Sequence, residues 1–176
     1  MIFLDLETSG LDPARHRILE CAVLITDDRF NPVSARVWVG ETLRPDECTP
    51  EVYAMHVASG LVAAADAWGG GDSLDGVLAR TLPAVSRIAG FSPHFDLWFL
   101  RTRCPLIADR LHHRVYDCST LRDLCGDYGQ PLMDGAAEPA HRALADCFAA
   151  LQVMRRFRAL ISAATSPQKE ISHGEG

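Results

Sequence analysis

Two carboxylates stand close together at the start of the chain, in the segment MIFLDLETSGLDP. Asp5 and Glu7 follow an apolar run and are separated by Leu6. Residues i and i+2 of an extended strand point to the same face, so these two acids are expected to lie a few ångströms apart. Like charges held together repel one another, and burying either one is costly. A positive partner is therefore expected between them.

Two more acids fall on apolar segments that are predicted to be helical. Asp96 follows GFSPHF and precedes LWFL; taken alone, it fits equally well an acid favoured by the dipole at a helix start. Asp146 is harder to explain as a surface residue, because it shares one helical face with the apolar residues Ala149, Ala150, Val153 and Phe157.

His141 is the candidate base beside these acids. It lies five positions before Asp146, about 140° around an ideal helix, so the two cannot share a face if both are helical. His141 is therefore expected at or before the first helical turn, although an ordinary loop histidine fits the sequence too. Together, Asp5, Glu7, Asp96 and Asp146 could hold two hard divalent cations, which clamp the attacking and leaving oxygens of a phosphoryl displacement. His141 would then accept the proton of the attacking water.

The chain resembles the DEDD exonucleases of the ribonuclease H-like fold in the order of three motifs: DLETSGLD, a central Asp and a C-terminal H-x4-D. The His of the last motif is typical of the histidine subclass. Position 142, where the tyrosine subclass has Tyr, is Arg142. The segments HVASGL, GFS and YDCSTLRDL further resemble oligoribonucleases, over nearly the whole chain to about residue 160. This resemblance implies a metal-dependent 3′→5′ exonuclease that releases 5′-mononucleotides from dinucleotides and very short RNA. It also implies two Mg²⁺ or Mn²⁺ ions on Asp5, Glu7, Asp96 and Asp146, and a homodimer.

The same resemblance implies a set of substrate-binding residues. Leu11 would wedge between the last two bases, and His56 would lie beside the substrate. A cap on the 5′ phosphate would be formed by Ser92, Arg114 and Ser119, with His113 where the family usually has an aromatic residue. The chain also has Gly90-Phe91-Ser92 in place of the usual Gly-Asn-Ser. These departures bear on substrate length and sugar preference rather than on hydrolysis.

Strands followed by alternating strands and helices predict an α/β domain that would position these residues. Strands are expected from residue 2, over 17–28 and 31–43 as an antiparallel meander, then after residue 87 and near 115. Helices are expected over 49–61, about 73–87, 95–104, 118–129 and from about 141, with a Gly-rich acidic loop over 62–76. The fold class is a mixed central sheet flanked by helices, with an exonuclease domain at 1–162 and a polar, disordered tail at 163–176.

Composition sets broad limits on function. The 176 residues fit one domain, and apolar and charged contents of 48% and 23% are ordinary for a soluble protein. No apolar run is long enough to span a bilayer, so a cytoplasmic protein without membrane contact is expected. The net charge of −6 argues against a grip on long nucleic acid, which needs a basic face. The six cysteines show no zinc-finger spacing and are expected to fill the core.

Three other functions remain open. A close relative could act on short or single-stranded DNA, as a DNA-dinucleotide nuclease or a proofreading-type exonuclease. A binding module could retain the fold without catalysis, although the full set of four acids and a histidine disfavours it. A phosphomonoesterase with a carboxylate nucleophile would carry Asp-x-Asp on the first strand, and Glu7 disfavours it.

Overall fold

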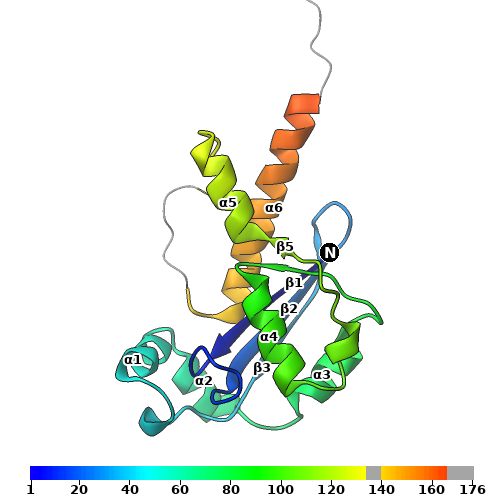
Figure 1. Ribbon diagram of the computed structural model, residues 1–176. Helices are drawn as coiled ribbons and strands as arrows, with labels where there is room; N and C mark the ends of the chain where they lie inside the picture. Colours follow the sequence, from blue (N-terminus) through cyan, green and yellow to red (C-terminus); the bar gives the residue numbers. More distant parts are fainter. Residues whose placement is uncertain (134–139, 166–176) are drawn as a thin grey trace, which may run out of the picture.

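The strands form one mixed sheet in the order β3-β2-β1-β4-β5, shown in Figure 1. This computed structural model describes residues 1–133 and 140–165. Within them, the strands are β1 (Ile2–Thr8), β2 (Ile18–Thr26), β3 (Pro32–Val39), β4 (Ile88–Gly90) and β5 (Tyr116–Asp117). β1, β2 and β3 pair antiparallel, whereas β4 pairs parallel with both β1 and β5. The predicted ribonuclease H-like arrangement, a meander followed by parallel strands, is confirmed.

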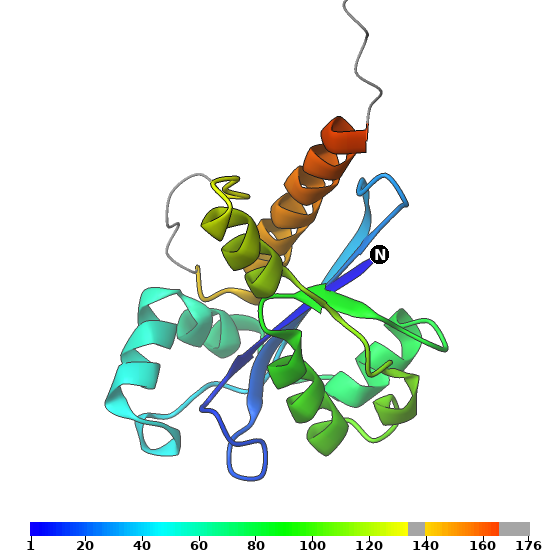
Figure 2. The ribbon, with the colours of Figure 1, turned by 45° about the horizontal axis from the view of Figure 1, so that its top comes forward.

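Six α-helices lie around this sheet in the described part of the chain (Figures 1 and 2). They are α1 (Pro50–Ala58), α2 (Leu61–Trp68), α3 (Leu74–Thr81), α4 (Pro93–Arg103), α5 (Cys118–Asp127) and α6 (Ala143–Thr165), with the short 3₁₀ helices η1 (Pro45–Glu47) and η2 (Ala108–Arg110). α5 and α6 lie side by side, whereas α3 and α4 lie together elsewhere on the sheet.

Alternation along β1 divides the apolar core between the two faces of the sheet. Leu4 and Leu6 pack with residues of α3 and α4, whereas Phe3 packs with residues of α6. Asp5 and Glu7 therefore share the face of Phe3 and point toward α6. The strand that buries the core thus aims both acids at the helix that carries Asp146.

Several predicted boundaries are wrong for local reasons. Residues 62–68 belong to α2 rather than to the predicted loop over 62–76, because the helix-forming VAAADAW run ends only at Gly69. α3 begins after its cap Ser73, as predicted, but ends at Thr81 rather than 87. Pro83 cannot continue a helix. α4 begins at Pro93, two residues before the predicted start.

The C-terminal helix reaches beyond the predicted domain boundary. α6 runs to Thr165, three residues into the predicted tail 163–176, and residues 166–176 lie outside the described residues. Of the helices in the described residues, none is both long and apolar enough to cross a membrane.

Candidate active site

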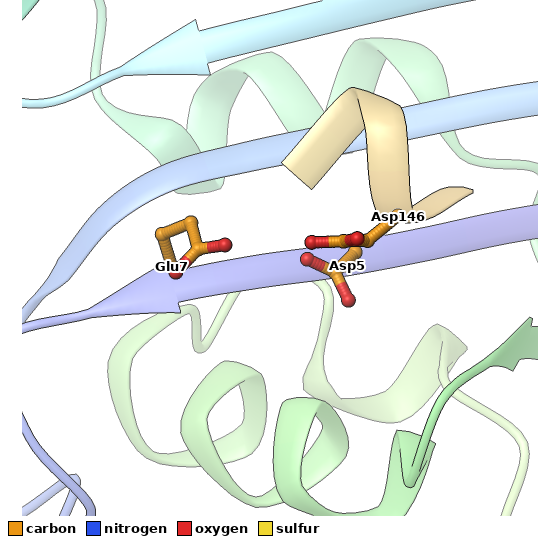
Figure 3. Close-up of side chains that lie close together, drawn as sticks. All are labelled: Asp5, Glu7 and Asp146. Carbon is orange, nitrogen blue, oxygen red and sulfur yellow. The ribbon is translucent and has the colours of Figure 1, made fainter. Parts of the chain in front are cut away.

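Three acids from two distant segments meet beside β1. A carboxylate oxygen of Asp5, one of Glu7 and one of Asp146 all lie within 4.8 Å of one another. Figure 3 shows Asp5 and Glu7 on β1 with Asp146 descending from the first turn of α6. The structure therefore brings the two acids of the first strand next to Asp146, the acid on the apolar face of the last helix.

The same acids line a cavity of about 330 Å³ that also contains Asp96 and His141. All five residues predicted for catalysis thus face one space. Apolar side chains form much of the remaining wall. The other lining residues are Leu6, Phe91, Ser92, Phe95, Arg122, Met133 and Ala149.

Asp96 reaches this cavity because β4 and α4 are joined by a tight turn. A Cβ atom on Gly90 would come within 2.7 Å of the Leu4 carbonyl oxygen, so β4 can lie this close to β1 only with glycine there. Ser92 adopts a left-handed conformation, with φ 53°, and Pro93 opens α4. The first turn of α4 then places Asp96 next to β1, where it is only 3% exposed.

His141 is held at the entrance to α6 by an ion pair that crosses from the sheet. Arg142 donates hydrogen bonds to both carboxylate oxygens of Glu20, at 2.8 and 3.2 Å, and the Ala143 amide donates to the same carboxylate at 2.8 Å. Glu20 lies on β2 and its side chain is 1% exposed. His141 itself has φ 49° and precedes α6, as predicted for a residue that cannot share the helical face of Asp146.

Burial and mutual repulsion make the acid cluster difficult to ionise. Burial, reinforced by the charges of Asp146 and Glu20, raises the pKa of Glu7 to about 8. Burial likewise raises the pKa of Asp96 to about 8 and that of Asp146 above its usual value. The pKa of Asp5 is raised by burial and by the charges of Asp96 and Glu7. Four acids that resist ionisation in one cavity are poorly compensated by the protein alone.

A divalent cation fits this set of ligands. Hard cations such as Mg²⁺ and Mn²⁺ prefer carboxylate oxygens, and three of these oxygens already lie within reach of a common centre. Positive charge at that centre would also relieve the repulsion that raises the acid pKa values. The acid cluster, rather than the cysteines, is thus the candidate metal site.

His56 lies behind the acids rather than in the cavity. Its side chain is fully buried, and its Nε2 lies 2.9 Å from the Thr8 carbonyl oxygen, which requires Nε2 to donate. Its Nδ1 is 4.0 Å from a Glu7 oxygen and has no hydrogen-bond partner in the described structure. Burial lowers the pKa of His56. A neutral imidazole here packs against Glu7 without adding a charge.

The predicted cap residues are only partly brought together. Ser92 lines the cavity, and its hydroxyl oxygen is 3.4 Å from that of Ser119. Leu11, His113 and Arg114 are exposed and do not line the cavity of this single chain. Their predicted roles in substrate binding stay predictions.

Other residues of the site were not predicted from the sequence. Glu20 sits in a strand of apolar residues and pairs with a residue 122 positions away, so only the folded sheet reveals its role. Arg122 also faces the cavity, with its guanidinium carbon 5.8 Å from the centre of the Phe91 ring. Its position three residues after Ser119 was the available signal, because residues i and i+3 share a helical face.

Solved structures of two exonucleases share this fold. Exonuclease I from Methylocaldum szegediense superposes with a TM-score of 0.63 at 21% identity, over 90% of this chain and 40% of that one. Exonuclease I of E. coli, in complex with the oligonucleotide 5cy-dT13, gives a TM-score of 0.61 at 20% identity, over 92% and 40%. The chain spans about two fifths of these exonuclease I chains and shares their fold.

Sequence relatives narrow the assignment. The oligoribonuclease of Escherichia coli K12 is 33% identical over 161 residues, 83% of this chain and 86% of its own length. The mitochondrial oligoribonuclease of Mus musculus is 30% identical over 193 residues, 99% of this chain and 80% of its own length. The exonuclease family model matches residues 2–154, and the chain belongs to this family of nucleases. The predicted resemblance to oligoribonucleases is confirmed.

Proposed function

We propose that the protein is a metal-dependent 3′→5′ exonuclease that hydrolyses dinucleotides and very short RNA oligonucleotides to 5′-mononucleotides. The observation that carries this proposal is the cavity in which Asp5, Glu7 and Asp146 lie within 4.8 Å of one another and which Asp96 and His141 also line. Its similarity to oligoribonucleases over most of its length supports RNA as the substrate.

Asp5, Glu7, Asp96 and Asp146 are the residues that would hold two Mg²⁺ or Mn²⁺ ions. When bound, such a pair supplies positive charge to the scissile phosphate and to the oxygens that attack and leave it. The apolar wall beside the acids lowers the local dielectric constant, which strengthens these electrostatic interactions.

His141 is proposed to accept the proton of the attacking water. It lines the same cavity as the acids, and its backbone is fixed by the adjacent bond between Arg142 and Glu20. A base that is already oriented avoids reorganisation during the reaction.

Short substrates fit the size and charge of the site. A volume of about 330 Å³ is close to the lower limit, about 300 Å³, of pockets that bind small molecules. The formal charge of −6 provides no overall attraction for a long polyanion. Both features favour a ligand of a few nucleotides.

The proposal is tested with 5′-labelled RNA and DNA of graded length in Mg²⁺. We expect two-residue RNA to be cleaved fastest, with 5′-mononucleotides as products. Efficient digestion of long single-stranded DNA would instead identify the alternative, a DNA-directed member of the family. Asp5→Ala should abolish turnover in a protein that remains folded by circular dichroism.

We also propose that the protein works as a homodimer in the cytoplasm. Arg114 and His113 are exposed in the single chain, and the resemblance to oligoribonucleases implies that a partner subunit helps to close the cap. Sedimentation equilibrium tests the dimer directly, and a mass equal to that of one chain at micromolar concentration would contradict it.

A further inference from the structure

A second cavity, the β3–α3 cavity, lies at the edge of the sheet opposite β5. Its volume is about 500 Å³, within the range of about 300–1,000 Å³ that is usual for small-molecule sites. Among the described residues, none lines both this cavity and the acid-lined one. Its polar and aromatic wall comes from β3, from α3 and from the residue before the cap of α3; these side chains are Arg36, Trp38, Asp72, Arg80 and Thr81. The structure thus contains a concave site that the proposed reaction does not use.

The two sides of the β3–α3 cavity follow from the periods of a strand and a helix. Arg36 and Trp38 are two positions apart on β3, so their side chains point to the same face of the sheet. Trp38 packs against the apolar cluster that contains Leu78 of α3, which identifies this face as the one that α3 covers. Val77 and Arg80 are three positions apart on α3 and share one helical face. The cavity is therefore formed by two regular elements rather than by loops.

The indole ring of Trp38 provides a fixed aromatic surface in this cavity. Its Nε1 donates to the Asp72 carbonyl oxygen at 2.9 Å, which links β3 to the start of α3. A Cβ atom on Gly40 would come within 2.8 Å of the ring, so glycine at this position leaves the space in which the ring lies. Because the ring is already bonded at its edge, a planar ligand can stack on it without ordering a mobile side chain.

Two guanidinium groups share the cavity with this ring. Arg36 is exposed, and among the described residues it has no hydrogen-bond or ion-pair partner. Arg80 forms an ion pair with Asp72 through Nη2, but the two side chains are 64% and 72% exposed. An ion pair that is this accessible to water is weak, so an anion can replace Asp72 as the partner of Arg80 at little cost. Both arginines are therefore available to a phosphate, which a guanidinium binds through parallel hydrogen bonds.

We propose that the β3–α3 cavity binds a nucleoside 5′-monophosphate. The base stacks on Trp38, and the phosphate is bound by Arg36 and Arg80. The Asp72 carboxylate accepts a hydrogen bond from a ribose hydroxyl. Two arginines and one aspartate give this cavity a positive formal charge in a chain whose net charge is −6, whereas acids line the active-site cavity. The choice of a nucleotide rests on the proposed function, because 5′-mononucleotides are the products of that reaction.

The test measures binding to the full-length Asp5→Asn variant in EDTA, so that phosphate cannot bind by way of metal ions at the active site. AMP, adenosine and inorganic phosphate are titrated separately by calorimetry. We expect adenosine and inorganic phosphate each to bind at least about 10-fold more weakly than AMP, because each lacks part of the contacts. Inorganic phosphate that binds as tightly as AMP would leave only an anion site and overturn the assignment. Adenosine that binds as tightly as AMP would also overturn it, since the arginines would then contribute nothing.

Substitution of the two arginines locates the phosphate. Arg36→Gln and Arg80→Gln should each weaken AMP binding by about 10-fold and adenosine binding by less than about threefold, because each removes charge-assisted hydrogen bonds to the phosphate. Arg29→Gln is the matched control: Arg29 is an exposed arginine between β2 and β3 that does not line the cavity, and its loss should leave AMP affinity unchanged. AMP affinity that is also unchanged when both Arg36 and Arg80 are replaced would overturn the assignment.

Tryptophan fluorescence locates the base. AMP should quench part of the emission, and Trp38→Phe should remove this quenching. Because phenylalanine keeps a ring for stacking, the calorimetric dissociation constant for AMP should rise by less than about fivefold in this variant. Quenching that persists in Trp38→Phe would place the base beside Trp68 or Trp98 and contradict the proposal.

Failure of this proposal and failure of the proposed function give different results. AMP binding to Asp5→Asn, together with no hydrolysis of dinucleotides by wild type, would support the β3–α3 cavity and reject the exonuclease function. Hydrolysis of dinucleotides by wild type, together with no AMP binding to Asp5→Asn, would reject the cavity alone.

Discussion

Replacing Glu20 is expected to destabilise the protein and to misplace His141 and Asp146 together. The Glu20 carboxylate is 1% exposed, and it accepts hydrogen bonds from Arg142 and from the first amide of α6. The Asp146 amide in turn donates to the Arg142 carbonyl oxygen at 3.1 Å. One carboxylate on β2 therefore fixes the segment that carries both functional side chains.

The size of the effect follows from these contacts. Removing one partner of a buried ion pair costs about 3–5 kcal/mol, and leaving a buried amide unsatisfied costs about 1–3 kcal/mol. The Arg142 side chain is 34% exposed and can regain water, which reduces the loss. Glu20→Ala should therefore destabilise by about 2–4 kcal/mol, equivalent to a Tm lower by about 5–15 °C. Glu20→Gln retains an acceptor and should cost about half as much.

Thermal unfolding and steady-state kinetics measure the two consequences. Because a displacement of about 1 Å in a catalytic group can cost 100-fold, kcat for Glu20→Ala should fall by about 10- to 100-fold at a temperature where the variant is folded. Glu41→Gln is the control, because Glu41 is an exposed acid that follows β3 in the chain. A Glu20→Ala variant with wild-type Tm and wild-type kcat would refute the reasoning.

Three further outcomes are expected at the acid cluster. His141→Ala should lower kcat by about 100- to 10,000-fold in stopped assays, whereas the Mn²⁺ dissociation constant measured by calorimetry should stay near that of wild type. A decrease in kcat of less than tenfold would exclude His141 as the general base. In EDTA, Tm should fall as pH rises from about 4.5 to about 8. Burial raises the folded-state pKa of Glu7 to about 8, so the folded protein keeps this proton over a pH range in which the unfolded chain has already lost it. Mg²⁺ should reverse this loss of stability, and a Tm that does not change with pH would contradict the reasoning. Asp146→Asn should raise the Tm of the metal-free protein at pH 8 by about 2–4 °C, because it removes one of the carboxylates that repel each other in the cluster. The same substitution should abolish turnover. A Tm lower than that of wild type would argue against repulsion among these carboxylates.

The strand acids could be predicted because their relation is local. Alternation alone places Asp5 and Glu7 on one face, and the structure shows both on the α6 side of β1. Asp146 was identifiable from its position on an apolar helical face, which requires only the helical period. Asp96 was identifiable only in combination with the other three acids, because the sequence around it equally fits an acid at a helix start.

The supporting contacts could not be predicted, since they depend on packing between distant segments. Glu20 and Arg142 are 122 positions apart and meet only when α6 lies on β2. The glycines that directly follow α2 predict a loop over 62–76, although the alanines of α2 favour a helix. Arg122 is one of many arginines on predicted surfaces, and only the placement of α5 beside Phe91 distinguishes it.

Calorimetric titration with Mn²⁺ tests the central claim, that the clustered acids share a cation site, most directly. Because Glu7 and Asp96 have a pKa of about 8, Mn²⁺ binding near pH 7 should release protons, seen as a dependence of the heat on buffer ionisation enthalpy. Asp5→Asn should abolish this binding, and Asp28→Asn, at an exposed acid, should not. Mn²⁺ binding that is unchanged in Asp5→Asn, or that releases no protons, would contradict the account.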